Sequence, residues 1–193
     1  MKQEIVKISL SRFLTYGIRK MTIQKLLSPL GISTKTVYKY FQNKEDLLRE
    51  CLILHYARLL GDIIQTIESH PNPVQALLNS WNLIIEADFG VTRVFYHDLN
   101  CYYPALQDEI LDKYFDKISE AAVNLLMRGM KEGYFIKDLN PIVSYIAMNV
   151  LYGSITRTDQ YKKLRIAPEI LTEQTLFIYL RGICTEKGLK EFS

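Results

Sequence analysis

The chain has 193 residues, of which 48% are hydrophobic and 23% charged, a composition that supports a buried core and excludes wholesale disorder. No run of 18 apolar residues occurs, which argues against a transmembrane helix, and Lys7 and Arg12 interrupt the N-terminal apolar residues, which argues against a signal peptide. The net charge of +3 divides into +6 for residues 1–50 and −3 for residues 51–193, so we expect the N-terminal end to bind a polyanion.

Apolar residues at helical spacing predict four helices in the first third of the chain, at residues 5–17, 23–28, 34–41 and 44–68. Gly17 ends the first of them, because glycine readily adopts the left-handed conformation that stops a helix. The side-chain oxygens of Thr22, Ser33 and Asn43 stand directly before the other three and are typical N-caps.

Proline and glycine mark the later breaks between helices. Pro73, Pro104, Pro141 and Pro168 occupy positions typical of a first helical turn, and Phe89-Gly90 is a further break. The last two predicted helices are residues 141–156 and 168–185. The whole pattern gives about nine helices and no convincing strand, so the predicted fold class is all-α.

Residues able to carry catalysis or bind a metal are sparse. The three histidines show no metal-ligand spacing, and no nucleotide-binding or nucleophile-elbow motif is present, so we expect no metal, no cofactor and no enzymatic activity. His97 and Cys101 are the one pair that suggests a base beside a thiol, and their spacing is weak support for catalysis. The odd number of widely spaced cysteines fits a reducing cytoplasm.

The most informative segment is residues 22–44, TIQKLLSPLGISTKTVYKYFQNK. Two short helices meet at a tight turn around Gly31, which is helix-turn-helix spacing. Val37 and Phe41 are four residues apart and are expected to face the core, which leaves a polar, basic and aromatic surface facing outward. Tyr38 and Tyr40 could alternatively be core aromatics.

Residues 1 to about 50 resemble the DNA-binding domain of the tetracycline-repressor (TetR) family. The resemblance is carried by Phe13, Tyr16-Gly17 and Thr22, and by the run from Gly31 to Leu47, which fits the pattern G-[VI]-S-x-x-T-[LV]-Y-x-Y-F-x-[NS]-K-E-x-L. The chain length and helix count fit the family as well. The resemblance implies a three-helix DNA-binding domain at residues 1–45 and a ligand-binding and dimerisation domain at residues 46–193.

The resemblance also implies roles for single residues. It places the second helix of the motif in a major groove of double-stranded DNA, where its first residues reach bases and phosphates. The residues expected to contact DNA are Thr22, Gln24, Thr34, Lys35, Thr36, Tyr38, Tyr40 and Lys44.

The body of the chain is expected to bind a small-molecule effector, since it supplies aromatic residues, methionines and isolated polar groups. The candidate ligand-binding residues are Trp81, Phe89, His97, Tyr103, Asn124, Met148, Asn149 and Tyr152. Ordinary core packing is the alternative for each of them. Trp81 and Asn149 stand out, because each brings a polar atom to an apolar helix face and needs a partner.

The last two predicted helices carry apolar stripes too broad to be covered on one side only. The resemblance implies that both helices of each protomer form a two-fold, four-helix dimer interface. The candidate interface residues are Ile146, Val150, Leu176, Leu180 and Ile183, with burial inside one protomer as the alternative.

The sequence therefore predicts a cytoplasmic, homodimeric transcriptional regulator, a ligand-responsive repressor on a near-palindromic operator. The alternative is an all-helical ligand carrier or enzyme whose basic head is incidental, and a DNA-bound activator would share every feature noted above. Neither the effector nor the operator can be read from the sequence.

Overall fold

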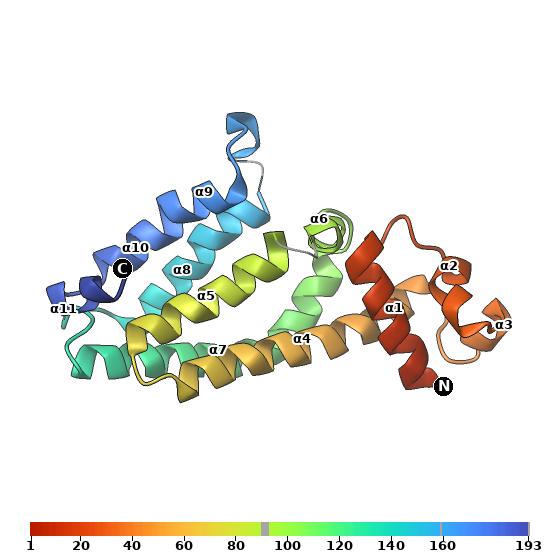
Figure 1. Ribbon diagram of the computed structural model, residues 1–193, viewed down its shortest axis with the longest axis horizontal. Helices are drawn as coiled ribbons and strands as arrows, with labels where there is room; N and C mark the ends of the chain where they lie inside the picture. Colours follow the sequence, from red (N-terminus) through yellow and green to blue (C-terminus); the bar gives the residue numbers. More distant parts are fainter. Residues whose placement is uncertain (90–92, 159, 193) are drawn as a thin grey trace. The chain divides into compact units, whose positions relative to one another are not determined.

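A computed structural model describes residues 1–89, 93–158 and 160–192. These residues are helical nearly throughout, and the extended pairing among them is one isolated antiparallel bridge between Phe135 and Cys184, which confirms the predicted all-α class (Figure 1). The chain divides into two compact units. Unit 1 comprises residues 1–61 and 86–113, and unit 2 comprises residues 62–85 and 114–193.

Unit 1 holds the N-terminal helices, α6, and the first parts of α4 and α7. The helices concerned are α1 (Lys2–Tyr16), α2 (Ile23–Leu27), a 3-10 turn (Ser28–Leu30), α3 (Thr34–Val37), α4 (Lys44–Ser69), α6 (Arg93–Tyr102) and α7 (Pro104–Lys131). Phe13, Leu26 and Leu47 are fully buried, and they bring α1, α2 and α4 around one apolar core.

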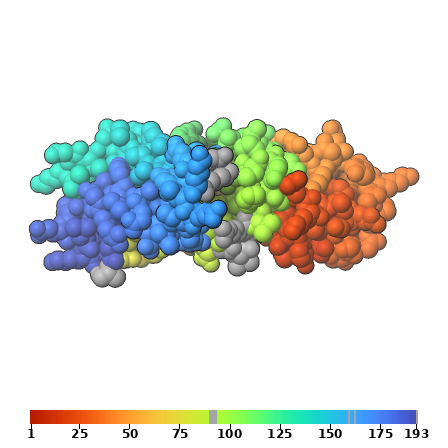
Figure 2. All heavy atoms as spheres, turned by 90° about the horizontal axis from the view of Figure 1, so that it is seen from above, coloured from red at the N-terminus to blue at the C-terminus, as the bar shows by residue number. Residues whose placement is uncertain are grey.

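Unit 2 is formed by the later parts of α4 and α7, most of α5, and everything after α7. Its remaining elements are α5 (Pro73–Phe89), α8 (Pro141–Thr156), a 3-10 turn (Lys162–Leu164), α9 (Pro168–Thr172), a π-helical turn (Glu173–Phe177), α10 (Ile178–Gly182), α11 (Glu186–Leu189) and a 3-10 turn (Lys190–Phe192). Its core includes Trp81, Phe135, Met148 and Leu176. The C-terminal residues, in blue, lie together on the face of unit 2 shown in Figure 2.

The predicted starts of α2, α3 and α4 and the predicted helix stop at Gly17 are confirmed, because their signals are local. Gly17 follows α1 with φ 80°, and Thr22 accepts a hydrogen bond from the backbone N–H of Lys25 at 3.2 Å. Ser33 accepts one from the N–H of Thr36, also at 3.2 Å, and Asn43 accepts one from the N–H of Asp46 at 2.8 Å.

Two predicted helices differ from the structure. The helix expected over residues 34–41 ends at Val37, and the following turn returns Phe41 to the core, where it is 2% exposed. The helix expected over residues 168–185 ends at Gly182. The Thr185 hydroxyl then caps α11 by accepting a hydrogen bond from the N–H of Gly188. When the continuous α9, π-helical turn and α10 are counted as one helix, the described residues form ten helices, against about nine predicted.

Other sequence predictions meet the structure only in part. Helix α5 ends at Phe89, as predicted, but Gly90 lies outside the described residues. The two compact units do not coincide with the predicted functional domains, residues 1–45 and 46–193. The division into a DNA-binding and a ligand-binding domain stays a prediction. In the described ranges, no helix is both long and apolar enough to cross a membrane, and no three metal-ligating side chains gather at one place.

Candidate nucleic-acid interface

Helices α2 and α3 form a helix-turn-helix whose inner side is closed by apolar residues. Leu26, Leu27 and Val37 are 0–1% exposed. Between the two helices Gly31 has φ 61°, in the left-handed region that glycine adopts without steric cost, so the chain reverses within a few residues. The side-chain caps at Thr22 and Ser33 fix where each helix begins.

The outer side of this motif carries the predicted DNA-contacting residues. Thr22, Gln24, Thr34, Lys35, Tyr38 and Tyr40 are all exposed. Tyr38 and Tyr40 are 56% and 42% exposed, so the alternative that they are core aromatics is wrong. Thr36 is half-buried, and its hydroxyl lies 3.1 Å from that of Ser33. Seven of the eight predicted residues thus belong to one short segment whose side chains are largely free to meet a ligand.

Lys44 is the exception among the eight. Its ammonium donates a hydrogen bond to the backbone carbonyl of Ile18 at 2.5 Å and lies 5.9 Å from the centre of the Phe13 ring. Partial burial lowers the pKa of Lys44, while the charge of Asp98 acts in the opposite direction. Because the ammonium is engaged inside unit 1, we expect Lys44 to hold the α1–α2 loop in place rather than to meet a phosphate.

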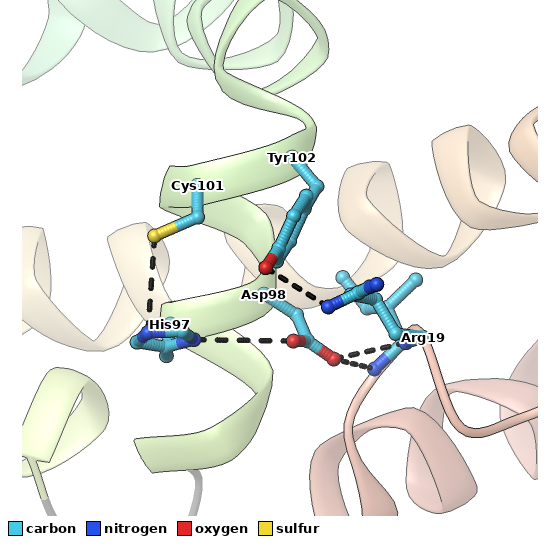
Figure 3. A network of polar contacts seen from close by, with 6 residues as sticks. Arg19, His97, Asp98, Cys101 and Tyr102 are labelled. Atoms are coloured by element: carbon cyan, nitrogen blue, oxygen red, sulfur yellow. Dashed lines mark hydrogen bonds and ion pairs between the residues drawn. The ribbon is translucent and has the colours of Figure 1, made fainter.

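A second contact, which no sequence motif indicated, also holds the α1–α2 loop in place. The carboxylate of Asp98, on α6, accepts hydrogen bonds from the backbone N–H groups of Ile18 at 2.8 Å and Arg19 at 2.9 Å (Figure 3). Asp98 is 8% exposed. The guanidinium of Arg19 lies 4.2 Å above the ring of Tyr102 and donates to its hydroxyl at 2.9 Å. Helix α6 therefore holds the loop that leads into α2.

Gly17 permits this close approach. A Cβ atom at this position would lie 2.6 Å from Val94 Cγ1 and 2.9 Å from Asp98 Oδ2, distances that side chains do not tolerate. Its φ of 80° is also unfavourable for any residue with a side chain. The sequence identified Gly17 as a helix stop, and the structure adds that α6 packs against it.

The suspected His97 and Cys101 pair is loose. The thiol lies 3.8 Å from His97 Nε2, and both side chains are exposed (Figure 3). The other ring nitrogen of His97 is 3.9 Å from Asp98 Oδ1, whose partner oxygen already accepts two backbone hydrogen bonds. This geometry gives no support to a base poised to activate a thiol.

The predicted effector-binding residues are divided between the two units. Phe89, His97 and Tyr103 belong to unit 1, and the other five belong to unit 2. Within unit 2, Trp81 and Tyr152 are buried with their ring centres 5.3 Å apart.

The two asparagines of that set are exposed. The amide of Asn149 has the partner that the sequence required, since it donates to the backbone carbonyl of Tyr145 at 2.8 Å. Trp81, Met148 and Tyr152 are thus the predicted residues that lie in the core of unit 2.

The predicted dimer-interface residues separate into two groups. Ile146 and Val150 on α8 are 51% and 65% exposed. Leu176, Leu180 and Ile183 are 0–5% exposed, so the prediction that they meet a partner is corrected: they pack inside their own protomer. The outward apolar residues of these helices are Ile142, Val143, Ile146, Val150, Ile170 and Ile178.

Comparison with known proteins finds a family model that matches the N-terminal segment. Residues 5–51, which include most of α1, all of α2 and α3, and the start of α4, match the family model of bacterial regulatory proteins of the tetR family. This segment is similar to that family, and the resemblance noted in the sequence of residues 1–50 is confirmed.

Similarity to individual proteins extends beyond the matched segment. The transcriptional repressor KstR2 of Mycolicibacterium smegmatis is 22% identical over 199 residues, which cover 98% of this chain and 93% of that protein. The nucleoid occlusion factor SlmA of Pasteurella multocida is 22% identical over 146 residues, 73% of each chain. A regulator from Saccharomonospora viridis, solved in complex with choline, has a TM-score of 0.71 at 15% identity and covers 96% of this chain and 98% of its own. That likeness shows a shared fold.

Proposed function

We propose that this protein is a sequence-specific DNA-binding transcriptional regulator of the TetR family. The observation that carries the proposal is the exposed polar and aromatic side of α2 and α3, backed by the buried Leu26, Leu27 and Val37. The exposed rings and hydroxyls of Tyr38 and Tyr40 are suited to contact sugars, phosphates and thymine methyl groups. The charge of +6 over residues 1–50 adds long-range attraction to DNA.

Single residues on this surface take different roles. Thr34, Lys35 and Thr36 open α3, and their proposed role is to meet base edges or phosphates in a major groove. Thr22 caps α2 and Gln24 lies in its first turn, and their proposed role is to meet the flanking DNA backbone. Phosphate contacts set the position of the protein, and base contacts select the sequence.

The proposed regulator acts as a homodimer. Support comes from the exposed apolar side of α8, where Ile142, Ile146 and Val150 recur at helical spacing and are each more than half exposed. A dimer presents two α3 helices to half-sites one helical turn or more apart, which suits a near-palindromic operator. Val150→Glu would introduce a charge on this side, and sedimentation velocity should then show monomers. Ile136→Glu, away from α8, is the matched control.

The regulator is proposed to be a repressor that responds to a small molecule. Support comes from the relative named as a repressor and from the similar fold solved with choline. A ligand changes operator affinity only if it binds the DNA-competent state and the alternative state unequally. Action on chromosomal DNA agrees with the cytoplasmic location predicted from the sequence.

A gel-shift titration tests the proposal, with DNA from upstream of the protein's own gene and a scrambled duplex of equal composition as competitor. The wild type should prefer the upstream DNA. Tyr38→Ala and Thr36→Ala should reduce that preference at least tenfold, whereas Phe115→Ala, which removes a ring 53% exposed in unit 2, should not. Equal affinity for both duplexes would overturn the proposal.

A further inference from the structure

A hollow of about 300 Å³ lies within unit 2, between α5, the helix formed by α9 and α10, and the C-terminal residues. It contains none of the residues that the sequence predicted for effector binding. Helix α5 contributes Gln75, Asn79 and Asn82 to its lining, and the π-helical turn contributes Glu173 and Phe177. π-helical turns often occur at functional sites, because they displace side chains from the regular helical register.

The C-terminal wall of the hollow is held in place by two contacts. The side-chain amide of Gln75 donates a hydrogen bond to the backbone carbonyl of Glu191. The guanidinium of Arg181 lies 5.2 Å from the centre of the Phe192 ring. A guanidinium stacked on an aromatic ring keeps its N–H groups directed outward from its edge, which is the geometry that binds a carboxylate through two hydrogen bonds.

Three charged residues line the hollow: Arg181, Glu173 and Glu191. Arg181 and Glu173 are eight residues apart on one helix, which separates their Cα atoms by roughly 12 Å along the axis. Neither residue belongs to an ion pair among those found in the described part of the chain. Both side chains are exposed, so their charges are available to a ligand.

The uncharged lining includes Asn79 and Asn82 from α5, and Phe177 from the same helix as Glu173 and Arg181. Carboxamides supply hydrogen bonds without adding charge, and an aromatic ring covers an apolar chain. A volume of about 300 Å³ is at the lower end for small-molecule sites, so the occupant is small.

We propose that this hollow binds a small, elongated molecule with a carboxylate at one end and an amine at the other. Arg181 takes the carboxylate, Glu173 takes the ammonium group, and Phe177 packs against the carbon chain between them. This site is separate from the DNA-binding surface and does not depend on the proposed regulatory function, since every residue in it belongs to unit 2.

Calorimetric titration of the full-length protein tests the site, with ω-amino acids from 4-aminobutyrate to 8-aminooctanoate as probes. Hexanoate and hexylamine each carry one of the two charged ends and serve as matched controls. At least one ω-amino acid should bind at 1:1 stoichiometry and at least tenfold more tightly than either control, because a charge-assisted hydrogen bond at each end adds to the affinity.

Two variants assign the ends. Arg181→Gln should weaken the bound ω-amino acid at least tenfold and leave hexylamine unchanged, and Glu173→Gln should weaken it similarly and leave hexanoate unchanged. Lys131→Gln and Glu169→Gln remove exposed charges of unit 2 outside the hollow and should have no effect. The proposal is overturned if no ω-amino acid binds at about 10 mM, or if binding survives both Arg181→Gln and Glu173→Gln in variants whose circular dichroism matches the wild type.

Discussion

The carboxylate of Asp98 accepts a hydrogen bond from the backbone N–H of Ile18, 80 residues earlier in the chain, at 2.8 Å. The backbone carbonyl of Ile18 accepts a hydrogen bond from the Lys44 ammonium at 2.5 Å. Charged side chains from α6 and α4 thus hold both polar groups of one residue in the α1–α2 loop. The hydrogen bond from the Arg19 N–H to Asp98 lies four residues before the start of α2. This contact therefore helps to set the position of the DNA-binding motif.

Asp98→Asn tests this anchor. An amide keeps one acceptor oxygen but loses the charge, and charge-assisted hydrogen bonds are worth about 1.5–3 kcal/mol each. The free energy of unfolding in urea should fall by roughly that amount, with operator affinity reduced as well. Asp112→Asn, an exposed carboxylate of the same unit, should change neither quantity. An unchanged urea midpoint for Asp98→Asn would show that the two hydrogen bonds carry no net stability.

Gly17→Ala should be more damaging than an ordinary glycine replacement. The added Cβ would meet Val94 and Asp98 at under 3 Å, and the backbone has φ 80°. Strain of this kind costs about 1–3 kcal/mol, to which the clash adds. Gly61→Ala is the matched control: it lies within α4 with open space around it, and should stabilise the protein by about 0.5–1 kcal/mol. The midpoint temperature of thermal unfolding should therefore fall for Gly17→Ala and rise for Gly61→Ala. A change in the same direction for both variants would contradict the close packing at Gly17.

Lys35→Gln should reduce the salt dependence of DNA binding. Lys35 is exposed at the start of α3, and loss of one phosphate contact lowers the slope of log affinity against log salt by about one. Lys44→Met should leave the slope unchanged, because its ammonium is held by Ile18, and should lower the stability of the protein. Fluorescence anisotropy between about 50 and 200 mM salt measures the slope. A larger change for Lys44→Met than for Lys35→Gln would reverse these assignments.

Lowering the pH should destabilise the folded protein, because His55 resists protonation in the folded state. Its Nε2 atom lies 2.5 Å from the Tyr96 hydroxyl, and burial, with a smaller contribution from Arg58, lowers the pKa of His55 from 6.5 to about 4. The folded state keeps the ring neutral while the unfolded chain takes up a proton below 6.5. The stabilisation is therefore complete above pH 6.5 and is lost as pH falls towards 4.

Between pH 7 and 5 this loss amounts to about 2 kcal/mol. The His55→Gln variant should not show this loss of stability, whereas His97→Gln, which removes an exposed ring, should still show it. Urea unfolding at both pH values measures the difference. Parallel pH profiles for the wild type and His55→Gln would contradict the buried, neutral histidine.

Local signals explain how much of this molecule the sequence could predict. The caps at Thr22, Ser33 and Asn43 act within three residues, so each helix start in the DNA-binding motif was predictable. The inward position of Val37 and Phe41 followed from their spacing of four residues, and their burial confirms it.

Contacts between residues far apart in the chain could not be predicted from the sequence. Nothing near Asp98 marks it as the partner of a loop 80 residues away, and nothing near Lys44 shows that its ammonium turns inward. The stripe of Leu176, Leu180 and Ile183 correctly indicated an amphipathic helix, but a stripe does not reveal whether it meets its own protomer or a partner. The π-helical turn between α9 and α10 further shifts which residues face outward.

We propose that helix α3 reads a DNA sequence as part of a dimer. Selection of bound fragments from a random duplex library, followed by sequencing, would test this proposal. We expect an enriched inverted repeat with half-sites one helical turn or more apart, and loss of that enrichment when Thr36 and Tyr38 are both replaced by alanine. Recovered fragments with no enriched sequence, or an enrichment that is the same for the wild type and the double variant, would contradict it.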